Sequence, residues 1–161
     1  DFPAGFLERV GNDDIRNFEI IRRALSELKR GGQILLFACS VEHSKFLCGC
    51  LTFLGVRAEH IDGAVGYSKR QKVIEEFKEG KIDVLTNFGV LSTGFDVPKV
   101  DVIFIVRPTA SIVLYSQMIG RGLRGPAIGG TSYCRIVDVK DNIEGFSDAE
   151  VVYEYFEEYW N

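Results

Sequence analysis

The sequence lacks the features that would place the protein in a membrane or in an oxidising compartment. Its longest apolar runs, such as Ile34–Cys39 and Val102–Val106, are far shorter than the about 20 residues of a membrane span. No basic segment followed by an apolar stretch opens the chain, so we expect no secretory signal. The four cysteines form no Cys-x-x-Cys pair. This favours buried, reduced thiols over a zinc site or a disulfide, and it fits a cytoplasmic protein.

The sequence also lacks a strong excess of charge of either sign. It has 19 basic and 23 acidic residues among 161, a formal net charge of -4. A free-standing nucleic-acid-binding protein usually has a basic face, so a nucleic-acid role needs a local groove here and predicts weak, salt-sensitive binding. The length allows one globular domain. Because the chain begins with Asp1 rather than Met, we expect it to be a fragment of a longer protein.

Strand-length apolar segments alternate with helical ones. The predicted strands are Ile34–Ala38, Val56–Ile61, Ile82–Thr86, Val102–Val106 and Ser132–Val139. The predicted helices are Asp14–Arg30, Val41–Leu54, a segment from a Ser68–Gln71 capping box to Gly80, Ser111–Gly122, and an aromatic and acidic terminal helix over Ser147–Trp160, laid on the domain. This alternation predicts an α/β fold, a mainly parallel sheet with helices on both faces. In the first helix, helical spacing predicts a core-facing stripe of Ile15, Phe18, Ile21, Leu25 and Leu28.

Two arginines and a glutamine form the first candidate site. Gln117, Arg121 and Arg124 are spaced by four and three residues, so a helix places them on one face. Unpaired arginines are costly to bury, and their planar fork suits phosphate, so we predict an anion as their shared target. The alternative is a solvated basic face. The glycines of 120–125 also spell Gly-x-Gly-x-x-Gly, but a helix precedes them and Pro126 follows, so we reject a dinucleotide site.

The second candidate site is the segment Leu85–Pro98, at the end of the third predicted strand, with a predicted loop over Asn87–Pro98. Gly94 can expose backbone N–H groups, and the carboxylate of Asp96 can accept a hydrogen bond from a ribose hydroxyl. The alternative is a turn in which Asp96 caps its own backbone.

Taken together, three segments resemble motifs of the superfamily 2 helicases of DEAD/DEAH type. Ile34–Ser40, Thr86–Pro98 and Gln117–Arg124 match motifs IV, V and VI in order and spacing, with Thr93–Pro98 as the motif V core. The resemblance covers about residues 30–140. It implies a RecA-like, P-loop NTPase-like three-layer sandwich, the second RecA-like domain of such helicases. The chain then divides into a lead-in helix (1–30), the helicase C-terminal domain (31–140) and a C-terminal helical extension (141–161).

The details of these motifs are similar to those of DNA-acting members, such as restriction-enzyme translocating subunits and repair helicases. The Gly-Phe-Asp core ending at Asp96 and the Gln at the head of motif VI carry this similarity. The RNA-acting DEAD-box group begins motif VI with His. Phe88 and Gly89 also stand where that group has Thr-Asp. We therefore expect DNA as the substrate, with RNA as the alternative.

The resemblance also implies roles for the site residues. ATP with Mg²⁺ would lie in a cleft against an N-terminal RecA-like domain of the same full-length chain, which binds most of both. Arg124 would be the arginine finger and Arg121 would bind the γ-phosphate. Gln117 would orient the nucleotide or bridge to the other domain. Gly94 and Asp96 would contact its ribose side. A monomer is expected.

The catalytic half that the resemblance assigns to the first domain is absent from this sequence. No Gly-x-x-x-x-Gly-Lys-Ser/Thr occurs, and Gly80-Lys81-Ile82 is the nearest match. No acidic Mg²⁺ motif follows a strand, so we predict no metal site. The isolated chain should therefore not hydrolyse ATP.

Four residues at the carboxyl ends of predicted strands are candidates for contacts with nucleic-acid phosphates. Ser40 and His43 follow the first strand, and Thr86 and Asn87 follow the third. The alternatives are a helix cap for Ser40 and a plain surface position for His43.

The sequence thus predicts the C-terminal motor domain of an ATP-dependent helicase or translocase that acts on DNA. The alternatives are a RecA-like nucleic-acid-binding scaffold without a catalytic partner, and an RNA helicase domain.

Overall fold

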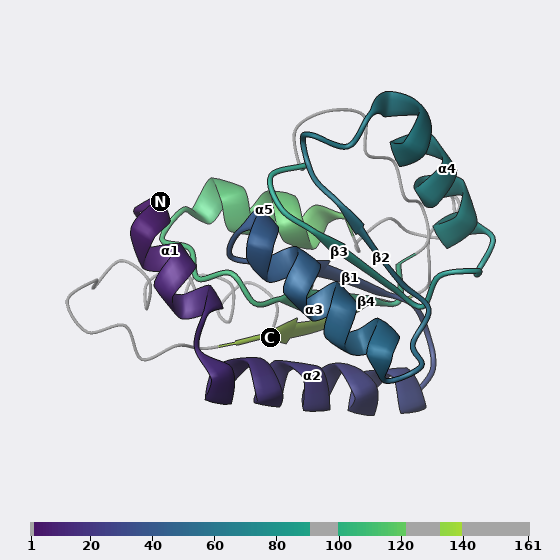
Figure 1. The fold of residues 1–161 in the computed structure, drawn as a ribbon, viewed down its shortest axis with the longest axis horizontal. Coiled ribbons are helices and arrows are strands. Elements are labelled where there is room, and N and C mark those ends of the chain that lie inside the picture. Colours follow the sequence, from purple (N-terminus) through teal and green to yellow (C-terminus); the bar gives the residue numbers. More distant parts are fainter. Residues whose placement is uncertain (1, 91–99, 122–132, 140–161) are drawn as a thin grey trace.

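The computed structural model describes residues 2–90, 100–121 and 133–139 (Figure 1). In chain order the elements are α1 (Ala4–Gly11), α2 (Asp14–Lys29), β1 (Ile34–Phe37), α3 (Val41–Phe53), β2 (Ala58–Ile61), α4 (Tyr67–Lys78), β3 (Val84–Asn87), β4 (Val102–Ile105), α5 (Ile112–Gly120) and β5 (Arg135–Asp138). All five predicted strands are present, each shorter than its apolar segment. The terminal helix predicted over Ser147–Trp160 lies outside the described residues.

The five strands form one sheet in the order β2-β3-β1-β4-β5. Every neighbouring pair is parallel, and in the central strand Leu36 is paired with Thr86 on one side and Phe104 on the other. The predicted parallel sheet is confirmed. Because the strands are parallel, their carboxyl ends meet at one edge, where the loops after β1, β3 and β4 begin.

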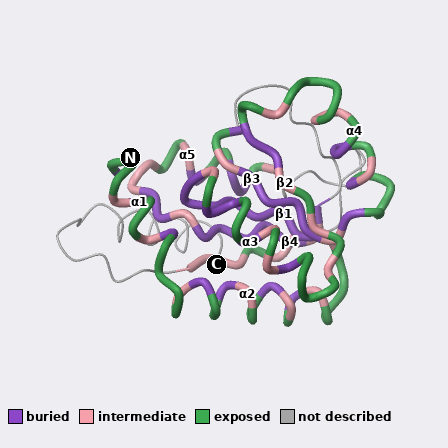
Figure 2. The backbone as a smooth tube through the Cα atoms, in the orientation of Figure 1, coloured by how far each residue is buried: buried purple, intermediate pink, exposed green. Residues whose placement is uncertain are grey.

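Helices cover both faces of the sheet, and each face has its own hydrophobic core. On one face, α2 and α3 pack against the side chains of Ile34 and Leu36. On the other face, α4 and α5 pack against Leu35 and Phe37. Successive residues of one strand therefore enter opposite cores, as the pleat requires. Figure 2 shows the three central strands, β3, β1 and β4, as the buried centre of the molecule.

The predicted lead-in helix over residues 1–30 is two helices. α1 ends at Gly11, and α2 begins after Asp13, whose carboxylate accepts a hydrogen bond from the Arg16 amide at 2.9 Å. The Asn17 side chain donates to the Gly11 carbonyl at 2.8 Å, which holds the corner together. At this corner the chain changes direction between α1 and α2, and α1 lies against the start of α3 (Figure 1).

The core-facing stripe of α2 was predicted one residue out of phase. Ile15 is 82% exposed and Phe18 is 65% exposed, whereas Ile20 and Ala24 are buried. Ile21, Leu25 and Leu28 are only partly buried against the core. The buried face also carries Asn17 and Glu27, and hydrogen bonds satisfy both. A rule that assigns the most apolar stripe to the core cannot anticipate this rotation, since it treats polar residues as exposed.

The predicted capping box at Ser68 is wrong. The N-cap of α4 is Gly66, without a side-chain cap, and Ser68 is an exposed residue inside the helix. The preceding turn explains the shift. The Asp62 carboxylate accepts hydrogen bonds from the amides of Ala64 and Val65, and the Arg70 guanidinium donates to the carbonyls of Asp62 and Val65. The turn directs the backbone so that α4 begins at Tyr67.

No helix in the described parts of the chain is long and apolar enough to cross a membrane.

Glu27 ties the helical layer to the edge strand β5. Its side chain is 1% exposed, and its carboxylate accepts a hydrogen bond from Arg135 Nε at 2.9 Å and pairs with Arg23 at 2.9 Å. Burial by itself raises the pKa of Glu27, but the hydrogen bond from Arg135 and the charges of Arg30 and Arg23 outweigh it, so the pKa is lowered. Glu27 therefore stabilises the fold as a carboxylate.

We predict that Glu27→Ala lowers the free energy of unfolding by about 3 kcal/mol, because it leaves the partly buried Arg135 cation without its partner. Urea denaturation at pH 7 measures the loss. The matched control is Glu19→Ala on the same helix, which removes an exposed pair with Arg22 and should cost less than about 1 kcal/mol. Equal losses in the two variants would contradict the role given to Glu27.

Candidate functional site

The carboxyl ends of the central strands are tied together by buried polar groups. Asn87, the last residue of β3, donates from its side-chain amide to the Leu36 carbonyl of β1 at 2.9 Å. The Cys39 thiol, just after β1, donates to the Val106 carbonyl after β4 at 3.3 Å, and Arg16 also donates to that carbonyl. These bonds fix where each loop leaves the sheet.

All four side chains predicted to contact nucleic acid are buried in this structure. Asn87 and Thr86 lie inside β3, and the Thr86 hydroxyl bonds the Ser44 carbonyl at 3.1 Å. Ser40 caps α3 by accepting from the amide of His43 at 3.0 Å, which is the alternative we gave for Ser40. These four side chains are therefore not exposed to a nucleic-acid backbone in this structure, because they are buried and their polar atoms bond within the protein.

His43 is neither a phosphate contact nor a surface residue. Its Nδ1 accepts a hydrogen bond from the Cys39 amide at 3.2 Å, so Nε2 carries the proton and donates to Asn17 Oδ1 at 2.9 Å. Gly11 lies against the ring so closely that an added Cβ would be 3.1 Å from it. Burial, and secondly the charge of Arg16, lower the pKa of His43 to about 4. The neutral ring thus joins α1, α2 and α3.

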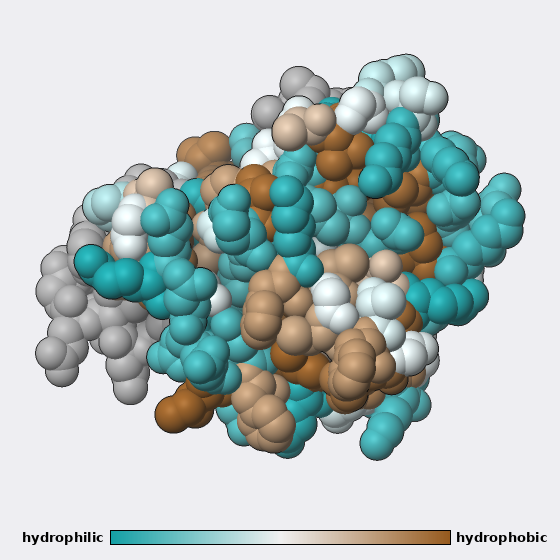
Figure 3. Space-filling model, viewed as in Figure 1, coloured by the Kyte–Doolittle hydropathy of each residue, from teal (hydrophilic) through white to brown (hydrophobic). Residues whose placement is uncertain are grey.

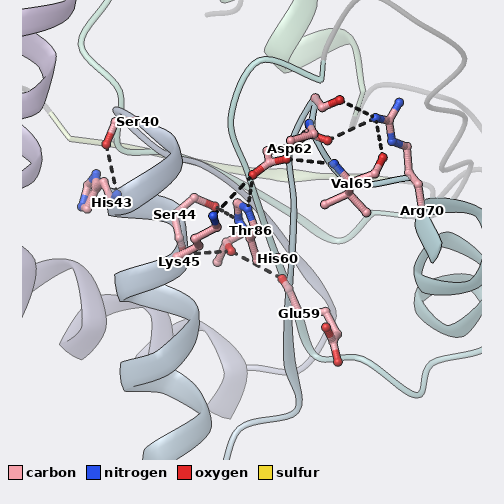
Figure 4. Close-up of polar contacts among 12 residues, drawn as sticks. Ser40, His43, Ser44, Lys45, Glu59, His60, Asp62, Val65, Arg70 and Thr86 are labelled. Atoms are coloured by element: carbon pink, nitrogen blue, oxygen red, sulfur yellow. Dashed lines mark hydrogen bonds and ion pairs between the residues drawn. The ribbon is translucent and has the colours of Figure 1, made fainter. Parts of the chain in front are cut away.

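A second histidine, His60, is partly buried and joins α3 to the end of β2 (Figure 4). Ser44 Oγ is 2.7 Å from His60 Nδ1, and His60 Nε2 is 2.9 Å from Asp62 Oδ2. The three residue types are those of a hydrolase triad, but the ring nitrogens are exchanged, because in a triad Nε2 faces the serine and Nδ1 the aspartate. Ser44 is also fully buried, so a substrate cannot reach its hydroxyl. The hydrogen bond from His60 is the main cause that lowers the pKa of Asp62. Asp62 therefore adds stability that is lost only as the pH falls below 3.8.

The helix α5 presents the predicted polar residues away from the core. Tyr115, Met118 and Ile119 are buried on its inner side, whereas Gln117 is exposed and Arg121, the C-cap residue, is half-buried. Arg121 stands four positions after Gln117, so the two share one face of the helix. Ser111 caps the start of the helix, and the Tyr115 hydroxyl donates to Asp138 Oδ2 at 2.6 Å. Arg124, Gly94 and Asp96 lie outside the described residues.

The structure adds one pair that sequence reasoning did not select. The guanidinium of Arg107, after β4, lies 5.2 Å from the centroid of the Phe88 ring, after β3. Burial lowers the pKa of Arg107. Gly89 follows with φ +70°, a left-handed conformation that favours glycine. The sequence does show that an arginine and an aromatic residue each follow a strand. It does not show the spatial order β3-β1-β4, which brings these two strand ends close together.

Within residues 2–90, 100–121 and 133–139, no three His, Cys, Asp or Glu side chains gather in a way that could hold a metal ion. The Mg²⁺ site that the resemblance assigns to a first RecA-like domain therefore stays a prediction about that domain.

Comparison with known proteins decides the family. The family model "Helicase conserved C-terminal domain" matches residues 16–125. This chain belongs to that family. The chain is 38% identical over 141 residues to the putative mitochondrial ATP-dependent helicase irc3 of Schizosaccharomyces pombe, covering 88% of this chain and 23% of the relative. It is 35% identical over 140 residues to the putative ATP-dependent helicase IRC3 of Saccharomyces cerevisiae, covering 86% and 20%. The chain thus spans about a fifth of these relatives.

The fold is shared with solved helicase structures. The Mycobacterium smegmatis helicase Lhr bound to ssDNA and AMP-PNP superposes with a TM-score of 0.68 at 18% identity, over 86% of this chain and 19% of that one. At this identity the likeness concerns the fold alone. The predicted RecA-like helicase C-terminal fold and the predicted family are both confirmed.

We predict that His43 makes stability fall between pH 7.5 and pH 5. Its folded pKa of about 4 lies below the usual 6.5. The unfolded chain therefore takes up the proton first, and the free energy of unfolding should drop by about 2 kcal/mol over this range. Urea denaturation at both pH values measures the drop.

In His43→Gln that part of the pH dependence should disappear, whatever the stability of the variant at pH 7.5. Glu42→Gln, a change at the exposed neighbouring residue, should keep it. A drop of the same size in His43→Gln as in the unaltered chain would show that another group titrates.

Proposed function

We propose that this chain is the C-terminal motor domain of an ATP-dependent helicase or translocase that acts on DNA. In this proposal the chain supplies motifs V and VI to an ATP site, and an N-terminal RecA-like domain of the longer protein supplies the phosphate loop and the Mg²⁺ ligands. The family assignment supports this function, because the helicase relatives are four to five times longer than the part that matches.

One observation carries the proposal. The face of α5 that holds Gln117 and Arg121 is turned away from the sheet, while Tyr115, Met118 and Ile119 anchor the opposite face. A helix fixed in this way places Gln117 and Arg121 on the side opposite to its buried residues, which is where the proposal puts the nucleotide. Arg121 and Arg124 then act on the γ-phosphate of ATP bound by the other domain, and Gln117 orients the nucleotide. Gly94 and Asp96 act on the ribose side.

DNA is proposed over RNA because of the motif details. Motif VI begins with Gln117 rather than His, and Phe88-Gly89 replaces the Thr-Asp pair of the RNA-acting DEAD-box group. In the structure the Phe88 ring contacts Arg107, and phenylalanine has no hydroxyl that could contact a nucleic-acid backbone at this position. With Ser40, His43, Thr86 and Asn87 buried, contacts at these loops would come from backbone N–H groups.

We predict that Arg121→Ala and Arg124→Ala in the full-length protein abolish DNA-stimulated ATP hydrolysis. Removal of an arginine finger lowers the rate by about 10³-fold or more, since the transition-state charge loses its partner. Steady-state ATPase assays with and without single-stranded DNA measure the effect. Arg9→Ala, an exposed arginine on α1, is the matched control and should hydrolyse ATP normally.

If both motif VI variants keep the unaltered rate, the assigned roles are wrong. If the full-length protein binds DNA but never hydrolyses ATP, the scaffold alternative replaces the motor. If RNA stimulates hydrolysis and DNA does not, the substrate assignment changes to RNA and the motor assignment stands.

The isolated 161-residue chain should show no ATP hydrolysis above background, because its sequence contains no phosphate loop. Turnover that persists through purification and disappears in Arg124→Ala would overturn the division of the site between two domains.

A further inference from the structure

An apolar groove runs along the outer surface between α2 and α3. Its volume is about 630 Å³, and its lining is Phe18, Ile21, Arg22, Leu25, Gly49, Cys50, Phe53 and Leu54. Phe53 is 90% exposed and Phe18 is 65% exposed. Figure 3 shows apolar surface gathered over these two helices. The groove is far from the α5 face that carries the proposed function, since α5 covers the opposite side of the sheet.

Several large apolar side chains gathered on one face indicate a binding surface, whereas scattered ones are ordinary. The out-of-phase rotation of α2 produces this face. The rotation buries Asn17 and Glu27 with their partners, leaves Phe18 exposed and leaves Ile21 and Leu25 only partly buried, next to α3. α2 thus has two apolar sides. One packs against the sheet, and in the described part of the chain nothing covers the other.

The chain leaves the described structure beside this helix. Val137, Asp138 and Val139 at the end of β5 line a second groove with Arg16, Arg22 and Arg23 of α2. Arg22 lines both grooves, so the end of β5 and the apolar groove lie on the two sides of one helix. A helix is about 10–12 Å wide, and the seven residues 140–146 can span up to about 23 Å, so the chain that follows can cross it.

The segment that follows has the pattern that fits the groove. At 100° per residue, one side of a helix over Ser147–Trp160 carries Ala149, Val152, Tyr153, Phe156, Tyr159 and Trp160. The opposite side carries Glu150, Glu154, Glu157 and Glu158. This is the division of apolar and charged residues expected of a helix that lays one face in an apolar groove.

The charges of the two surfaces are complementary. Ser147–Trp160 contains five acidic residues and no basic one. From Phe18 to its C-cap Arg30, α2 carries Arg22, Arg23, Lys29 and Arg30 against Glu19 and Glu27, a net charge of +2. Arg22 lines the groove and pairs with Glu19, whereas Arg23 and Arg30 pair with the buried Glu27. This part of the helix therefore keeps a positive charge toward an acidic segment docked beside it.

We propose that Ser147–Trp160 docks within its own chain as an amphipathic helix in the α2–α3 groove. The helix covers Phe18, Leu25 and Phe53 with its aromatic face and directs its glutamates toward the basic residues of α2. The docked segment fixes the outer helical layer of the domain, on the side opposite to α5.

The only tryptophan of the chain, Trp160, reports on this contact. In the unaltered 161-residue chain we expect blue-shifted Trp160 emission that acrylamide quenches weakly, because the indole lies in the groove. Phe53→Asp places a carboxylate in the groove at a position that is almost fully exposed without the segment, so it should leave the fold intact. It should shift the emission to the red and raise the quenching. Tyr67→Asp, a 77% exposed aromatic residue on α4, is the control and should change neither.

Two further measurements separate the outcomes. Removal of residues 147–161 should increase the fluorescence of an added apolar dye, and Phe53→Asp in that shortened chain should reduce it again. Circular dichroism checks that each variant is folded. The proposal is overturned if Trp160 of the unaltered chain emits like a water-exposed indole. It is also overturned if the emission is blue-shifted but Phe53→Asp does not change it. A blue shift that disappears on dilution, together with a dimer in sedimentation, assigns the groove to the segment of a second copy and also overturns docking within one chain.

Discussion

The structure depends on a central strand that is apolar on both faces. β1 contributes Ile34 and Leu36 to one core and Leu35 and Phe37 to the other, and it hydrogen-bonds to a parallel strand on each side. A strand buried in this way must be covered by helices above and below, and parallel neighbours need crossover connections. The helical layers, and the single edge at which the loops begin, follow from this constraint.

Buried polar groups then determine the positions of the loops and helices. Asn87 ties β3 to β1, His43 joins three helices, and Glu27 holds the helical layer to β5. Each group is satisfied, so it adds specificity without the cost of an unmade hydrogen bond. Two of these groups, Asn87 and His43, were predicted to contact nucleic acid, since polar residues at strand ends look alike in sequence whether they serve a ligand or the fold.

The two sides of the domain are divided between two tasks. α5, with Gln117 and Arg121 outward, belongs to the face that we propose acts on ATP, and α2 with α3 forms the face that we propose its own C-terminal segment covers. The sheet separates these faces. A change in one outer layer can therefore alter stability without displacing the side chains of the other.

By itself, the sequence determined the fold class, the five strands and the helices α2, α3, α4 and α5 apart from their exact ends, because these follow from hydrophobic periodicity along the chain. The helicase family followed from the resemblance of three segments to known motifs in order and spacing. Only the tertiary structure decided which polar residues are internal. The burial of His43 depends on the approach of Gly11 and Asn17 across a helix corner, and the pairing of Arg107 with Phe88 depends on the spatial order of the strands. Such contacts join residues that are distant in sequence, so local patterns do not encode them. The rotation of α2 has the same cause, since the partner that makes Glu27 a core residue is Arg135, 108 positions away.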